Sequence, residues 1–135
     1  MVGRGYGRVL NVASTAAFQP GPLMATYYAS KAFVLHFSEA IANELQGTGV
    51  TVTALCPGPT ASGFQERAAM QESKLVQGGL MSAETVVELG YQALISGKVV
   101  EIPGLSNKVG AWSARLVPRQ TAVGIVRRMQ ERQGH

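Results

Sequence analysis

A chain of 135 residues, with 46% hydrophobic and only 15% charged residues, can bury one hydrophobic core and is too apolar to be disordered. We therefore expect a single domain over residues 1–135. No apolar run reaches the roughly 18–20 residues that span a bilayer, and the first residues lack the long apolar stretch of a signal peptide. The one cysteine, Cys56, has no partner for a disulfide within the chain, so we expect a reducing, cytoplasmic setting.

The net charge of +4 is concentrated at one end, because seven basic residues but only two acids follow position 97. A basic tail can attract nucleic acid or anionic lipid. A solvated helix face is the simpler interpretation, so we expect no nucleic-acid partner, and contact with a membrane surface stays open as a less favoured alternative. The sequence has no aspartate and only two histidines. A Ser-His-Asp triad is therefore excluded, and we expect no metal site.

The first half of the chain predicts a strand, a loop and a long helix. Residues 8–13 (RVLNVA) are typical of a short apolar strand, and the proline and glycine residues of segment 18–22 favour a loop. A helix follows over residues 24–46, ended by Gly47 and Gly49. Apolar residues lie on nearly every side of this helix, so we expect it to be buried on most sides.

The second half predicts two more strands with helices between and after them. Residues 51–56 are rich in β-branched residues and stop at a Pro-Gly-Pro turn. Residues 82–96 are expected to be a helix capped by its serine, and 98–102 a third strand. Two short helical stretches flank Pro118. Strands that alternate with helices indicate an α/β fold with a parallel sheet. One edge strand would be exposed and apolar, so we expect a missing segment or a partner chain to cover it.

Three residues in the first half predict acid–base chemistry at a carbonyl or an alcohol. Tyr27 and Lys31 lie four residues apart at the start of the predicted helix, so they share a face. An isolated tyrosine has a pKa of about 10 and is a poor base at neutral pH. A nearby ammonium stabilises the phenolate, and the hydroxyl of Ser14, at the end of the first strand, can hold the reacting oxygen. Each residue alone would be interpreted as a turn residue, a half-buried aromatic or a solvated charge.

Three sequence motifs resemble those of a known family. They are NVAS at 11–14, YYASK at 27–31 and LCPGPT at 55–60, and in order and spacing they resemble the short-chain dehydrogenase/reductase family. The resemblance covers essentially the entire chain. It implies an oxidoreductase that uses NAD or NADP on a small-molecule carbonyl or alcohol. The implied fold is the C-terminal half of a Rossmann-type doubly wound parallel sheet, with three strands, two main helices on opposite faces and a helical tail.

The resemblance also implies a role for each matching residue. Tyr27 would be the acid and base and would also bind the cofactor, and Lys31 would stabilise its phenolate and bind the nicotinamide ribose. Ser14 would orient the substrate oxygen. The turn that contains Pro57, Gly58 and Thr60 would pack on the nicotinamide.

The cofactor-binding half of the family is absent from this sequence. Members of the family open with a glycine-rich turn that cradles the cofactor pyrophosphate at a helix N-terminus. Gly3, Gly5 and Gly7 do not replace it, because they precede a strand and the family's turn follows one. We therefore expect a truncated member, begun at an internal methionine, that binds NAD or NADP weakly. The residues that choose between the two lie in the absent half, and segment 61–79 is expected to shape the substrate pocket.

Two other functions stay open. The first is ester hydrolysis, with Ser14 as nucleophile and Tyr27 with Lys31 as its base, although the chain has neither a G-x-S-x-G nor an S-x-x-K motif. The second is a non-catalytic oligomerising fragment. In the resembled family the helices that correspond to 24–46 and 82–96 commonly build subunit interfaces, so we expect a homo-oligomer.

Overall fold

A computed structural model of the chain describes residues 1–62 and 79–131. Three parallel strands form its sheet in the order β1 (Gly7–Val12), β2 (Val50–Leu55) and β3 (Val100–Glu101). Val12 pairs with Leu55 at the end of β1, and Leu55 pairs with Glu101. The carboxyl ends of all three strands therefore meet at one edge of the sheet, which is where open parallel sheets bind their ligands.

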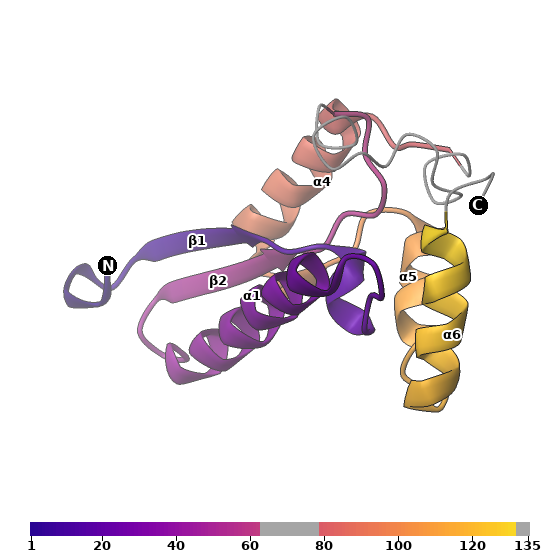
Figure 1. Ribbon diagram of the computed structural model, residues 1–135. Coiled ribbons are helices and arrows are strands. Elements are labelled where there is room, and N and C mark those ends of the chain that lie inside the picture. Colours follow the sequence, from indigo (N-terminus) through magenta and orange to yellow (C-terminus); the bar gives the residue numbers. More distant parts are fainter. Residues whose placement is uncertain (63–78, 132–135) are drawn as a thin grey trace.

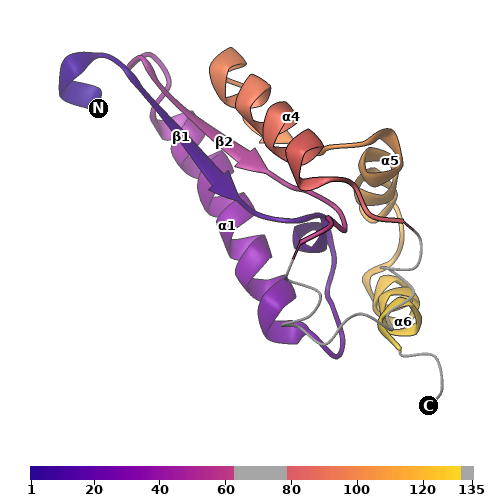
Figure 2. The ribbon, with the colours of Figure 1, turned by 90° about the horizontal axis from the view of Figure 1, so that it is seen from above.

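Helices cover both faces of this sheet. The long helix α1 (Ala25–Glu44) lies on one face and α4 (Ala83–Ser96) on the other, as Figures 1 and 2 show. Two short 3₁₀ helices, η1 (Val2–Arg4) and η2 (Thr15–Phe18), flank β1. The α/β class, the three parallel strands and the two main helices predicted from the sequence are thus confirmed.

The ends of α4 follow from its sequence. The hydroxyl of Ser82 accepts a hydrogen bond of 3.2 Å from the backbone N–H of Thr85, as a serine cap should. Glu84 places a negative charge in the first turn, where the helix dipole favours it. Gly97 ends the helix with a φ of 71°, a left-handed conformation that favours glycine. These three features confirm the predicted boundaries of the helix.

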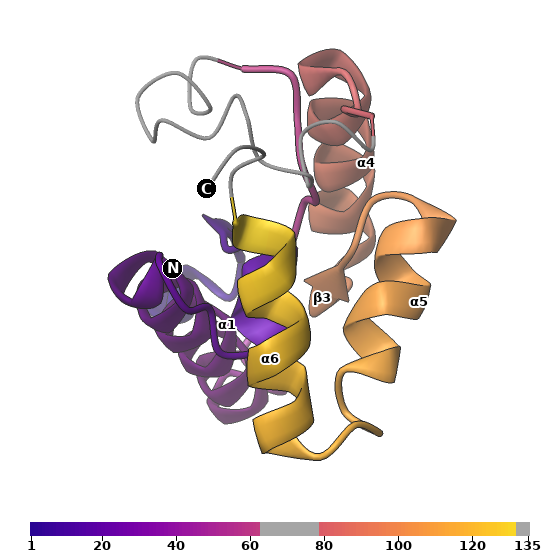
Figure 3. The same ribbon diagram turned by 45° about the vertical axis from the view of Figure 1, so that its right-hand side comes forward.

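The chain after β3 forms a helical pair that returns to α1. Helices α5 (Leu105–Ser113) and α6 (Arg119–Gln130) flank Pro118, as predicted. In Figure 3, α6 lies in the foreground, with α1 on one side of it and α5 on the other. The side chain of Gln130 donates a hydrogen bond of 2.7 Å to the hydroxyl of Tyr28, 102 residues earlier. The tail therefore folds against the first turn of α1.

The core consists of small side chains between the sheet and its helices. Its main cluster contains Leu35 of α1, Ala54 and Cys56 at the end of β2, and Ala111 of α5. On the opposite face, Gly90 of α4 lies against Leu55, which brings that helix close to β2. The sheet edge at which the predicted site lies is thus supported by closely packed side chains of the core.

The prediction that α1 is buried on most sides is wrong. Phe33 is 68% exposed and Phe37 49% exposed, and their rings stack on each other with centroids 5.8 Å apart. Among the described elements, β1, β2 and η2 make the main contacts with α1, so its opposite side remains uncovered. β1 is also an edge strand, and Val12 is 52% exposed. The exposed apolar edge expected from the sequence is therefore present.

Two further predictions concern the substrate pocket and membrane-spanning segments. Most of segment 61–79, expected to shape a substrate pocket, lies outside the described residues. None of the described helices is long and apolar enough to cross a membrane.

Candidate active site

Ser14 lies two residues after the end of β1 and caps the start of η2. Its backbone is extended, and its hydroxyl accepts a hydrogen bond of 3.1 Å from the backbone N–H of Ala16, which fixes the side chain at the start of the 3₁₀ helix. The same hydroxyl lies 3.5 Å from the carbonyl oxygen of Pro57, at the limit of a hydrogen bond. Ser14 is only 9% exposed. A buried hydroxyl in one fixed orientation suits a residue that holds a substrate oxygen.

Lys31 connects the helix to the strand that carries Ser14. Its ammonium donates a hydrogen bond of 3.0 Å to the carbonyl oxygen of Val12, the last residue of β1. The same nitrogen lies 5.8 Å from the centroid of the Tyr27 ring. One turn of α1 separates Tyr27 from Lys31, so the two side chains lie on the same face of the helix. The structure thus brings the ammonium close to both the phenol and the end of the strand.

Tyr27 is half-buried, and its ring packs beside that of Tyr28. The two ring centroids lie 6.0 Å apart, and the ring planes are inclined by 77°, an edge-to-face arrangement. Tyr27 and Met24 pack against a small buried cluster of Ala16, Tyr28 and Val126. The position of Tyr27 therefore depends on η2 and on α6 as well as on its own helix.

The turn after β2 lies next to Ser14. The carbonyl oxygen of Pro57 accepts a hydrogen bond of 3.0 Å from the backbone N–H of Thr15. The hydroxyl of Thr60 donates a hydrogen bond of 2.9 Å to the carbonyl oxygen of Gly58, which closes the turn on itself. The structure thus brings Ser14, Lys31 and the turn 57–60 together at the carboxyl ends of β1 and β2, and Tyr27 lies next to Lys31.

One neighbour of this turn was missed by sequence reasoning. The side chain of Asn107 in α5 donates a hydrogen bond of 2.7 Å to the carbonyl oxygen of Pro103 and lies directly against Gly58. A Cβ atom on Gly58 would overlap this amide. The glycine is therefore required by a contact with the tail helix. A lone asparagine in a helix gives no sequence signal for such a contact.

The nearby cysteine is not a nucleophile. Cys56 is fully buried, and burial raises the pKa of its thiol to about 12. The reactive form of cysteine is the thiolate, which is negligible at neutral pH for such a pKa. In the part of the chain that the structure describes, no three histidine, cysteine or glutamate side chains gather as metal ligands would.

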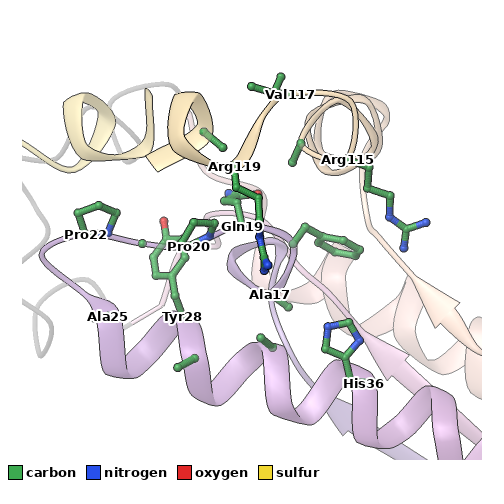
Figure 4. A pocket seen from close by; sticks show the side chains of 16 residues that line it. Ala17, Gln19, Pro20, Pro22, Ala25, Tyr28, His36, Arg115, Val117 and Arg119 are labelled. Carbon is green, nitrogen blue, oxygen red and sulfur yellow. The ribbon is translucent and has the colours of Figure 1, made fainter. Parts of the chain in front are cut away.

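A separate cavity of about 710 Å³ lies between α1, the loop after η2 and the α5–α6 pair (Figure 4). Its polar lining includes His36, Arg115 and Arg119, and the ring of Tyr28 faces it. None of the predicted site residues lines it.

Comparison with known proteins identifies relatives of this chain. A family model described as short chain dehydrogenase matches residues 1–73, which contain every predicted site residue. The 3-oxoacyl-[acyl-carrier-protein] reductase of Synechocystis sp. is 42% identical over 60 residues, which are 44% of this chain and 24% of that protein. The 2-dehydro-3-deoxy-D-gluconate 5-dehydrogenase of Bacillus subtilis is 41% identical over 58 residues, which are 43% of this chain and 23% of that protein.

The fold has solved relatives as well. A short-chain dehydrogenase from Sphingobium yanoikuyae in complex with NADPH superimposes with a TM-score of 0.70 and 26% identity, over 99% of this chain and 51% of that one. The present chain thus spans about half the length of this relative, and its matches span about a quarter of the two curated proteins.

Proposed function

Since this chain belongs to the short-chain dehydrogenase family, we propose that Ser14, Tyr27 and Lys31 perform the proton transfer of a carbonyl–alcohol oxidoreduction. The main support for this proposal is the position of Lys31. Its ammonium bridges from α1 to the end of β1 and stands 5.8 Å from the Tyr27 ring. In this proposal the positive charge balances the negative charge that develops on Tyr27 during proton transfer.

The proposed proton path follows from these positions. In the reducing direction the Tyr27 hydroxyl donates its proton to the substrate oxygen, while the Ser14 hydroxyl holds that oxygen by a hydrogen bond. The charge left on Tyr27 is balanced by Lys31 until a proton returns from solvent. In the oxidising direction the Tyr27 phenolate removes the proton of the alcohol. A buried serine and a fixed ammonium need little rearrangement during either transfer.

The residues present fit one end of a nicotinamide cofactor. Lys31, near Tyr27, and the turn 57–60, next to Ser14, would offer an ammonium, a hydroxyl and backbone groups, a donor set suited to a ribose and a carboxamide. When bound, the nicotinamide accepts or supplies the hydride that accompanies the proton. The residues present do not fit the pyrophosphate end of the cofactor, because the sequence has no G-x-G-x-x-G motif. We therefore propose weak binding of NAD or NADP to this chain, and a second, cofactor-binding half in the complete catalytic unit.

The test is turnover of NADPH and NADH with a panel of ketones and their alcohols. Tyr27→Phe should abolish turnover, and Ser14→Ala should lower it by roughly 10²–10³-fold, the range for loss of one donor that holds the reacting oxygen. Tyr6→Phe is the matched control, since Tyr6 is an exposed tyrosine just before β1, at the end of the strand opposite the site. Full turnover by Tyr27→Phe would refute the proposal. Hydrolysis of a nitrophenyl ester that requires Ser14 would favour the esterase alternative.

We also propose that the chain self-associates through its exposed helix faces. The stacked Phe33 and Phe37 lie on α1, and Val87, Tyr91 and Ile95 form a similar exposed row on α4. An apolar surface of this kind usually marks an interface. Sedimentation velocity should detect a dimer or larger species, and Phe33→Glu should dissociate it. Leu116→Glu, an equally apolar exposed position outside both helices, should not. A monomer at all concentrations would contradict this proposal.

A further inference from the structure

The first turn of α1, which carries Tyr27, is weakly stabilised by its own sequence. Leu23, just before the helix, has a φ of 71°, a strained value for a residue with a side chain. Met24 stands at the cap position and makes no side-chain cap hydrogen bond. The first turn also has no acidic residue to balance the helix dipole. Something outside the helix must therefore hold this turn in place.

Tyr28 supplies that support through contacts with three other segments. It is only 6% exposed. Its ring lies so close to Gly21 that a Cβ atom there would overlap it, and it packs with Ala16 of η2 and Val126 of α6. Its hydroxyl accepts the hydrogen bond of 2.7 Å from Gln130, which is itself 7% exposed. Tyr28 is thus the point where the loop, η2 and α6 meet.

This support reaches Tyr27 directly. The two residues are neighbours in the chain, and their rings touch edge to face. Burial raises the pKa of the Tyr28 phenol, so the hydroxyl stays protonated and does not compete with Tyr27 for the substrate proton. Gln130 lies at the end of α6 and 102 residues from Tyr28. The hydrogen bond between them therefore connects the end of the described chain to the residue next to the proposed acid.

We propose that Gln130 and Tyr28 are positioning residues, and that α6 sets the orientation of the Tyr27 ring through their hydrogen bond. This inference rests on the proposed function of Tyr27. It predicts that loss of the bond impairs the proton transfer while leaving substrate affinity nearly unchanged, because neither residue lies among the groups that would touch the substrate. Small displacements of a reacting group can cost up to about a hundredfold in rate.

The experiment compares Gln130→Ala, Tyr28→Phe and the double variant with the parent chain. The control is Gln120→Ala, which makes the same chemical change at an exposed position of the same helix. Each of the three test variants should lower kcat by about tenfold with KM changed less than twofold, and the double variant should be no worse than either single one, since all three break one bond. The control should match the parent.

A second measurement, NMR of the tyrosine rings, does not depend on catalytic turnover. The chain has four tyrosines, so carbon-13 labelling of the tyrosine rings gives a spectrum in which each can be assigned. Gln130→Ala and Tyr28→Phe should shift the Tyr27 ring signals and leave those of Tyr6 and Tyr91 in place. If the parent shows no turnover, the proposed function fails, and the ring signals alone decide this inference. Unchanged Tyr27 signals in folded Tyr28→Phe, which keeps the ring and its packing, would overturn it even if Gln130→Ala does not fold.

Discussion

Replacement of Gly58 by alanine tests the contact between the turn after β2 and the tail helix. The φ angle of Gly58 is not in the left-handed region, so its backbone conformation is open to alanine. The cost of the change is therefore steric, because the new Cβ atom would overlap the Asn107 amide. That amide cannot move away freely, since it is hydrogen-bonded to the carbonyl oxygen of Pro103 at 2.7 Å.

The expected magnitudes follow from these contacts. Overpacking at one position costs about 1–3 kcal/mol of unfolding free energy, which we expect for Gly58→Ala. Asn107→Ala removes one hydrogen bond and should cost about 0.5–1.5 kcal/mol. The double variant no longer has the overlapping amide, so its loss should be smaller than the sum of the two single losses by roughly 1–2 kcal/mol.

Urea unfolding of the parent, both single variants and the double variant measures this coupling. Independent sites add to within about 0.5 kcal/mol. A coupling smaller than that would show that Asn107 does not restrict Gly58, and the account of this turn would be wrong. A coupling of the expected size would show that α5 holds the turn in place.

Two predictions concern other single residues. The thiol of Cys56 has a pKa of about 12 in the folded chain and about 8.5 in the unfolded one, so the unfolded state binds fewer protons between these values. The unfolding free energy should then fall by about 1.4 kcal/mol per pH unit above pH 9. Urea unfolding at several pH values should show a smaller fall of the unfolding free energy with pH for Cys56→Ala. Gly47 and Gly49 both have positive φ, but only at Gly49 would a Cβ atom overlap the backbone of Gly5. Gly47→Ala should therefore cost about 1–2 kcal/mol and Gly49→Ala clearly more, and equal melting temperatures would refute this difference.

The fold was predictable where local signals agree. The β-branched residues of β2, its Pro-Gly-Pro stop and the caps of α4 at Ser82 and Gly97 gave boundaries within about two residues of those observed. Likewise, Ser14 follows β1 and the turn 57–60 follows β2, and the carboxyl ends of neighbouring parallel strands meet at one edge of the sheet.

Contacts between distant segments were not predictable. The apolar pattern of α1 indicated burial, yet Phe33 and Phe37 are exposed, because periodicity records which side chains are apolar and not whether a neighbour covers them. Nothing in the sequence pairs Gln130 with Tyr28 or Asn107 with Gly58. These contacts depend on the path of the tail after β3, which local propensity does not determine.

The most direct test of the proposed site uses only the end of the cofactor that its residues fit. Reduced nicotinamide mononucleotide is titrated into nitrogen-15-labelled protein, and the amide signals are followed by NMR. We expect shifts at Ser14, Tyr27, Lys31 and Thr60, an affinity within about tenfold of that for NADH because no pyrophosphate motif is present, and loss of the shifts in Lys31→Met. Signals at these residues that stay unchanged at millimolar ligand, or shifts that persist in Lys31→Met, would contradict the central claim.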